Sequence, residues 1–204
     1  IKILIFFTML TLLPSFIIMF TSFTRITVVF SLLKNAIGAQ QSIPSQILVG
    51  LAIFLTIFIM QPVYTEINEV ALKPYSNEEI TFEQALENAS NPLKDFMLKE
   101  TRQKDLELFV DAAKLNSGEL TRENIPLYSI VPAFAISELK TAFQIGFLLF
   151  VPFMVIDMIV ASVLMSMGMM MIPPTVISLA FKLLLFVMVD GWNLIVKSLI
   201  TSFS

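Results

Sequence analysis

Two long runs without a charged residue constrain this sequence more than any other feature. Residues 3–24 carry no acidic or basic side chain, and neither do residues 35–65. A helix of about 20 apolar residues crosses the hydrocarbon core of a membrane, which is about 30 Å thick. Helices also satisfy their own backbone hydrogen bonds, as a segment inside lipid must. The two runs therefore predict an all-α membrane protein.

The composition agrees with this fold class and excludes several kinds of active site. The chain has 204 residues, of which 56% are hydrophobic and 14% charged. Soluble domains carry about 25% charged residues, so most of this surface is not suited to water. The chain contains no Cys and no His. Disulfides, a Ser-His-Asp triad and imidazole or thiolate metal ligands are therefore excluded, and we expect no enzyme activity, cofactor or metal.

Charge is concentrated in the middle of the chain. Residues 66–140 hold 14 acids and 8 bases, a net charge of −6, out of 16 acids and 13 bases in the whole chain. We predict a first apolar helical hairpin over residues 1–65, an acidic helical insert over 66–131 and a second apolar hairpin over 132–204. No basic stretch is long enough to follow a nucleic acid backbone, so nucleic acid is not an expected partner.

The two hairpins are expected to contain four apolar helices. Pro14 should kink the first helix without ending it, and Pro62 should end the second. Arg25 and Lys34 place positive charge near the tip of the first hairpin, which puts this tip in the cytoplasm and the insert outside it. The expected segments are 3–24, Gln46–Met60, a third ending near Met167, and a fourth from Thr175 to about Ile200.

Capping patterns predict that the insert is helical. Ser76-Asn-Glu-Glu79 and Thr81-Phe-Glu-Gln84 both match the capping box, in which a Ser or Thr begins a helix and a Glu or Gln follows three residues later. Asn91-Pro92 is typical of a cap followed by proline at the first helical position. Apolar residues then recur at helical spacing, so we expect an insert with one apolar packing face.

A methionine-rich stretch lies between the third and fourth apolar segments. Five of the 12 Met residues fall within residues 165–171. Gly168 and Pro173-Pro174 predict a turn, because glycine permits unusual backbone angles and proline cannot continue an incoming helix. One interpretation is a helix end buried in protein. The other is a soft pore seal, to which each of several copies contributes Met169, Met170 and Met171.

Four charged residues fall within or beside the apolar segments: Arg25, Asp157, Lys182 and Asp190. Arg25 should lie either at a membrane interface or inside a long helix that faces other protein. Asp157 and Lys182 stand at similar distances from the predicted turn, so an ion pair between them is expected. A secondary transporter that uses Asp157, Lys182 and Asp190 is an alternative, although no inverted repeat is evident. An aspartyl intramembrane enzyme is disfavoured, since Val-Met-Val rather than Gly-x-Gly precedes Asp190.

Seven stretches, which lie along nearly the whole chain, carry a resemblance to a known family. They are Phe20-Thr-Ser-Phe-Thr-Arg25, Leu32-Leu-Lys-Asn-Ala-Ile-Gly38, Pro132–Phe147, Val151-Pro-Phe-Met-Val-Ile-Asp157, Met167-Gly-Met-Met-Met-Ile-Pro-Pro174, Phe181-Lys-Leu-Leu-Leu-Phe186 and Asp190-Gly-Trp192. Together, and in this order, they resemble the FliP/SctR family of export-gate proteins from type III secretion machines. Features around Thr24-Arg25 and over 96–109 look more flagellar than those of the injectisome branch, which remains the alternative.

The resemblance implies a function and a set of partners. Members of this family assemble in several copies with FliQ and FliR, with FlhB and FlhA as neighbours, in the inner membrane at the flagellar basal body. The complex is the entrance channel for unfolded flagellar export substrates. The resemblance also implies a cone-like helical assembly held largely above the membrane plane, with apolar surfaces covered mainly by neighbouring subunits. Because the chain begins at Ile1, we expect a cleaved signal peptide to precede it.

Overall fold

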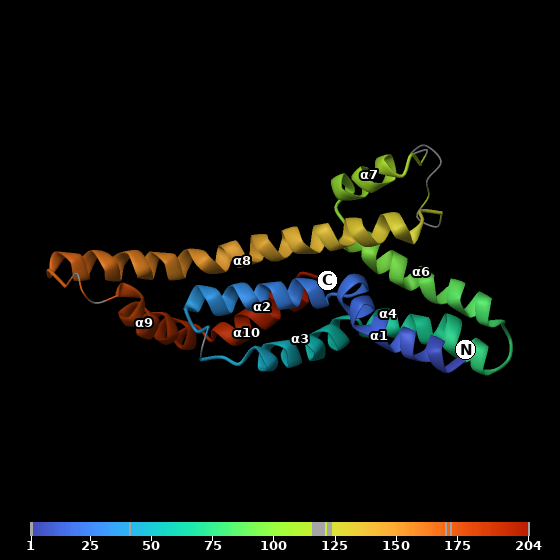
Figure 1. The fold of residues 1–204 in the computed structure, drawn as a ribbon, viewed down its shortest axis with the longest axis horizontal. Helices are drawn as coiled ribbons and strands as arrows, with labels where there is room; N and C mark the ends of the chain where they lie inside the picture. Colours follow the sequence, from blue (N-terminus) through green and yellow to red (C-terminus); the bar gives the residue numbers. More distant parts are fainter. Residues whose placement is uncertain are drawn as a thin grey trace. The chain divides into compact units, whose positions relative to one another are not determined.

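Helices make up all of the regular structure that the computed structural model describes, as expected for an all-α chain (Figure 1). The described residues are 2–40, 42–115, 121, 124–169, 171 and 173–203. In chain order the helices are α1 (Lys2–Phe20), α2 (Phe23–Ile37), α3 (Ser45–Ile59), α4 (Gln61–Ile67), the π-helical segment η1 (Asn68–Leu72), α5 (Lys73–Ser76), α6 (Phe82–Glu100), α7 (Gln103–Ala112), α8 (Leu127–Ser166), α9 (Pro174–Met188) and α10 (Gly191–Thr201).

One helix of the described residues, α8, is by itself long and apolar enough to cross a membrane. It runs for 40 residues. The number of candidate spans rises to four if each of three bent helix pairs counts as one span. The first of these pairs joins Pro14–Phe20 of α1 to α2, and the second joins α3 to Gln61–Ser76, which comprises α4, η1 and α5. The third joins α9 to α10. By length and composition the described residues thus offer one to four candidate spans, and three of the four are bent or broken.

The chain forms two compact units. The first comprises Ile1–Thr24 and Thr56–Lys140, and the second comprises Arg25–Leu55 and Thr141–Ser204. Most of the first unit is the polar middle of the chain, and the second holds the remaining apolar helices together with the methionine-rich turn. Each of α2, α3 and α8 contributes residues to both units.

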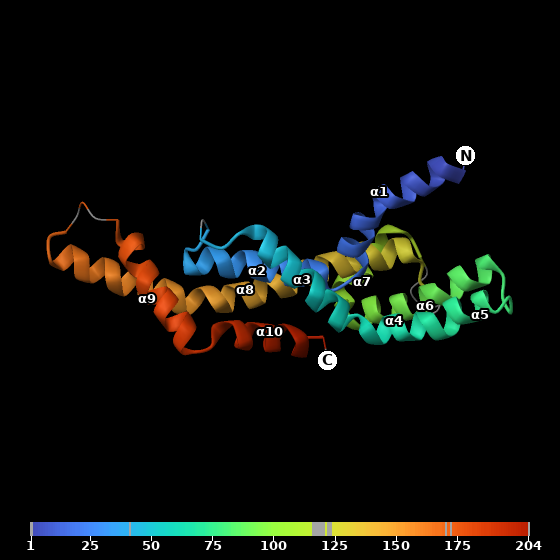
Figure 2. The same cartoon turned by 90° about the horizontal axis from the view of Figure 1, so that it is seen from below.

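The described part of the insert is mainly helical, as predicted, with turns between its helices. In both views α4 lies beside α6, and the structure also packs η1 against α6 (Figures 1 and 2). The Asn88 side chain of α6 donates a hydrogen bond to the Val70 carbonyl in η1, at 3.1 Å. A small core of Met97, Ile125, Ile130 and Phe134 is almost fully buried. The apolar face predicted for the insert therefore packs against the first residues of α8.

Only one of the three predicted helix starts in the insert is correct. Thr81 begins α6, and its side chain forms the complete capping box with Gln84. Ser76 instead is the last residue of α5. The cap predicted at Asn91 is also wrong, because α6 continues through Pro92. A proline inside a helix costs about 3 kcal/mol or more. Pro92 is buried, as is Met97 five residues further along.

In the second unit, α2 packs one continuous face into the core. Ile26, Val29, Phe30 and Leu33 follow helical spacing and are at most 1% exposed. On α8, a Cβ atom at Gly146 would lie 2.2 Å from Leu32 Cδ1. The absence of a side chain at this glycine therefore allows α2 and α8 to approach closely, and the two helices lie side by side in both views (Figures 1 and 2).

The fourth apolar segment is broken, which corrects the single helix predicted from Thr175 to Ile200. Between α9 and α10, Asp190 adopts a left-handed conformation with φ of 52°. The two helices are bent by 63° at this break. Asp tolerates left-handed angles better than most residues, which is why the helix can end here without a glycine at that position. Phe186 and Trp192 pack edge to face across the bend, with ring centroids 5.3 Å apart.

Candidate functional site

The methionine-rich turn forms by a standard glycine-terminated helix end. Gly168 has φ of +74°. Its N–H donates to the Met165 carbonyl at 3.1 Å, and the Met169 N–H donates to the Leu164 carbonyl at 3.0 Å. This pair of hydrogen bonds is the Schellman motif, which stops a helix at a left-handed residue. Pro174 then begins α9, preceded by Pro173 in an extended conformation. Gly168 thus ends α8 and the two prolines precede and begin α9, as the sequence predicted.

The methionine side chains of this turn are largely uncovered by the chain itself. Met171 is 96% exposed, and Met165 and Met167 are 62% and 67% exposed. Met169 is partly buried, and Met170 lies outside the described residues. The chain itself therefore does not bury Met165, Met167 and Met171, and burial of this turn by other protein stays open. The predicted convergence of three methionines from each copy stays a prediction.

A buried ion pair joins α8 and α9, as the sequence predicted. Lys182 Nζ lies 2.6 Å from Asp157 Oδ2 and donates a second hydrogen bond, of 3.1 Å, to the Ala36 carbonyl of α2. Ser178, one turn before Lys182, donates to Asp157 Oδ1 at 2.6 Å. The Lys182 side chain is 8% exposed and that of Asp157 is 37% exposed. The lysine thus ties three helices together, and the aspartate lies at the edge of the cluster.

Arg25 is buried by its own chain, a third arrangement beyond the two that the sequence suggested. It lies in the first turn of α2 and is 2% exposed. Its guanidinium donates to the Ser202 carbonyl at 2.9 Å and to Ser202 Oγ at 3.1 Å. The same group stacks 3.7 Å from the ring centroid of Phe203. Carbonyls at the end of a helix attract positive charge, so Arg25 stabilises the end of α10.

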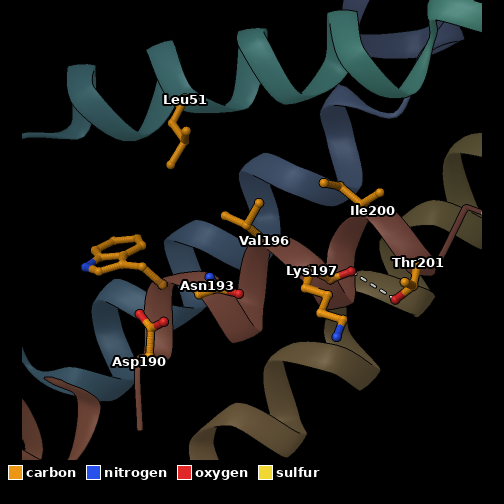
Figure 3. A pocket seen from close by; sticks show the side chains of 8 residues that line it. Leu51, Asp190, Asn193, Val196, Lys197, Ile200 and Thr201 are labelled. Carbon is orange, nitrogen blue, oxygen red and sulfur yellow. Dashed lines mark hydrogen bonds between the residues drawn. The ribbon is translucent and has the colours of Figure 1, made fainter. Parts of the chain in front are cut away.

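Asp190 lines an open groove of about 670 Å³ along α10 (Figure 3). Leu51 of α3 forms part of the opposite wall, while Asn193, Lys197 and Ile200 follow Asp190 on the α10 side. Asp190 precedes the first residue of α10, but its side chain makes no capping hydrogen bond. Asp190 therefore lies apart from the ion pair of Asp157 and Lys182, and these three residues do not form one cluster.

A separate polar cluster connects α7 to α8 in the first unit. Arg102 forms an ion pair with Asp105, and Ser137 donates to Asp105 Oδ2 at 2.6 Å. The Arg102 N–H also donates to Ser137 Oγ at 3.1 Å. Burial by itself would raise the pKa of Asp105. The hydrogen bonds from Ser137 and Arg102 and the charges of Arg102 and Lys140 outweigh it and hold this pKa below its ordinary value.

Sequence patterns alone missed several of these contacts. Nothing in the sequence indicates that the carbonyls of Ala36 and Ser202 accept hydrogen bonds from Lys182 and Arg25. Ser178 could have been found, because it lies four residues before Lys182 and so on the same helix face. No group of His, Cys, Asp or Glu among the described residues has the geometry to hold a metal ion.

Fold and site together define an all-α protein with apolar helices suited to a membrane, charged side chains paired inside them, and an exposed methionine-rich turn. The family model described as "FliP family" matches residues 6–199. The chain therefore belongs to the FliP family.

Three relatives illustrate the match, and each is named flagellar biosynthetic protein FliP. The relative from Bacillus subtilis (strain 168) is 55% identical over 203 residues, covering 100% of this chain and 91% of the relative. The relative from Aquifex aeolicus (strain VF5) is 52% identical over 204 residues, covering 100% of this chain and 85% of the relative. The relative from Buchnera aphidicola subsp. Acyrthosiphon pisum (strain APS) is 54% identical over 201 residues and is longer, since the match covers 98% of this chain but 53% of that protein.

Proposed function

We propose that this chain is a subunit of the bacterial flagellar export apparatus and that it helps to form the entrance pore for unfolded flagellar export substrates. The observation that carries the proposal is the family match over residues 6–199, together with 55% identity to a flagellar FliP over the whole chain. The relatives described above all carry the flagellar name, which favours the flagellar system over the injectisome.

In this proposal the methionine-rich turn closes the pore between export events. A closed pore must exclude ions, and an apolar constriction does so by excluding water. Methionine is unbranched and flexible, so it can seal a narrow neck and still give way to a passing side chain. The exposure of Met171 and the glycine- and proline-defined turn support a projecting loop rather than a helix end packed in its own chain.

We infer that several copies of the chain assemble with FliQ and FliR, with FlhB and FlhA as neighbours, in the inner membrane at the flagellar basal body. Large apolar side chains that the chain leaves uncovered support this assembly. On α3 alone, Phe54 is 73% exposed and Ile57 is 63% exposed. Exposed apolar patches of this kind indicate contact with lipid or with other subunits.

The proposed topology keeps the three segments derived from the charge pattern. Residues 1–65 and 132–204 form the apolar hairpins, and residues 66–131 lie on the outer side of the membrane. A transporter mechanism is less well supported, because the buried Lys182 already binds Asp157 and a backbone carbonyl. Those contacts hold α2, α8 and α9 together, which favours a structural role for Asp157 and Lys182 over transport.

The mass and composition of the complex purified through this chain test the proposal. The expected result is one complex that contains several copies of this chain and two further kinds of small membrane subunit. Recovery of a single copy without other subunits, from cells that assemble flagella, would contradict it. As a control, the same purification with the Asp157→Ala/Lys182→Ala chain should yield less complex if the buried pair supports assembly.

A further inference from the structure

Among the described charged side chains of the second unit, one acid and one base make no ion pair or side-chain hydrogen bond. Outside residues 66–140 the chain holds two acids and five bases. Asp157 pairs with Lys182, Arg25 binds Ser202, and Lys34 donates to Ser45 Oγ at 3.0 Å. Among the charged residues whose side chains the structure describes in this part, Asp190 and Lys197 remain, and neither makes an ion pair or side-chain hydrogen bond.

Both residues line the same groove, but they are too far apart along α10 to form an ion pair with each other. Lys197 follows Asp190 by seven residues, which corresponds to a rise of about 10 Å along a helix. Figure 3 shows the two side chains apart along α10, with Val196 and Ile200 giving the groove an apolar wall. Asp190 and Lys197 are both exposed in the single chain, and charges carried on apolar helices usually have a partner in the assembled protein.

We propose that this groove is a contact between neighbouring copies of this chain, in which Asp190 of one copy forms an ion pair with Lys197 of the next. This inference rests on the proposed function, which requires several copies. The charge pattern of the groove is complementary to itself when a second copy is shifted along the helix. Both charges lie in one groove about 10 Å apart, so the contact joins the groove of one copy to the groove of the next.

The same pattern argues against other occupants. Because each copy carries one Asp190 and one Lys197, copies of the chain can neutralise each other's charges without any further component. Apolar side chains of a neighbour would cover Leu51, Val196 and Ile200, which line the same groove. A phospholipid with a zwitterionic head group could also meet both charges, and the experiment separates it from a second copy.

Disulfide formation tests the contact, because the chain contains no native Cys. Two differently tagged full-length chains, one with Asp190→Cys and the other with Lys197→Cys, are produced together and the complex is purified and mildly oxidised. We expect a covalent dimer that carries both tags. Asp190→Cys paired with Leu194→Cys is the matched control, since Leu194 lies on α10, is 55% exposed and does not line the groove. No dimer is expected from that pair.

Charge reversal provides a second test that does not depend on the cysteine variants folding. Asp190→Lys and Lys197→Asp should each lower the yield of the multi-copy complex by about tenfold or more, as loss of a close charge pair does. The double variant should restore the yield to within about twofold, because a difference of that size is less than 0.5 kcal/mol.

Two results would overturn the contact. The first is a multi-copy complex that gives no Asp190–Lys197 dimer, or as much dimer with the Leu194 control. The second is a double reversal as defective as the single reversals, and loss of bound phospholipid in that variant would then assign the groove to lipid. If the purified complex holds only one copy of the chain, the proposed function fails instead, so the two failures are distinguishable.

Discussion

Removing one partner of the Asp157–Lys182 ion pair should lower the free energy of unfolding, by an amount that depends strongly on which partner is removed. Asp157→Ala leaves the Lys182 ammonium 8% exposed, with the Ala36 carbonyl as its remaining hydrogen-bond acceptor. Lys182→Met leaves the Asp157 carboxylate, which is 37% exposed and still accepts a hydrogen bond from Ser178. Water can reach the stranded aspartate far more easily than the stranded lysine.

The magnitudes follow from these two environments. Breaking a buried pair so that a charge is left inside costs about 3 to 5 kcal/mol, which is our expectation for Asp157→Ala. For Lys182→Met we expect about 1 to 3 kcal/mol, since the unsatisfied group is then mainly the Ala36 carbonyl. The double variant removes both charges and should be more stable than Asp157→Ala alone, by about 1 kcal/mol or more.

The measurement is the free energy of unfolding of the purified chain in detergent, followed by far-ultraviolet circular dichroism during a denaturant titration. Asp111→Ala, at an exposed position of α7, serves as the matched acid-to-alanine control and should change stability by less than about 0.5 kcal/mol. The reasoning is refuted if Lys182→Met costs as much as Asp157→Ala, or if the double variant loses the sum of the two single effects.

Three further predictions concern the insert and the methionine turn. The depressed pKa of Asp105 means that its contribution to stability is present above its ordinary value of 3.8 and is lost as the pH falls through the lower pKa of the folded state. The difference in unfolding free energy between the wild type and Asp105→Asn should therefore shrink towards zero in acid, and a constant difference would contradict it. Single Cys residues at exposed positions of the insert should react with an impermeant reagent added outside the inner membrane, and reaction only from the cytoplasmic side would reverse the topology. Replacing Met169, Met170 and Met171 together by Ala should leave the complex assembled while cells leak small ions, whereas loss of assembly without a leak would indicate a packing role.

Helix ends that are determined by residues close together in the sequence were predictable. Thr81 with Gln84 began a helix as expected, because a capping box satisfies two backbone N–H groups by side chains close in sequence. Gly168 and the two prolines that follow ended one helix and began the next for equally local reasons. The pairing of Asp157 with Lys182 was also predictable, since two opposite charges in apolar helices have few other partners.

Features that depend on packing were not predictable in the same way. Pro92 looked like a helix start, yet α6 continues through it, with Pro92 itself buried. The break at Asp190 was missed because the apolar run continues on both sides of it. Hydropathy carries no information on whether a single residue adopts a left-handed backbone conformation. The environment of Arg25 depends on Ser202 and Phe203, far away in sequence, and no local pattern indicates such a contact.

A photocrosslink from the methionine turn to a substrate in transit tests the central proposal most directly. A photoreactive amino acid at position 171, where the side chain is 96% exposed, is introduced into the full complex while an export substrate is stalled during secretion. The pore model predicts a covalent adduct between this chain and the stalled substrate, and no adduct from the same group placed at Glu79 on the exposed surface of the insert. A fully assembled, secreting complex that gives no adduct at position 171 would contradict the proposal that this turn lines the export pore.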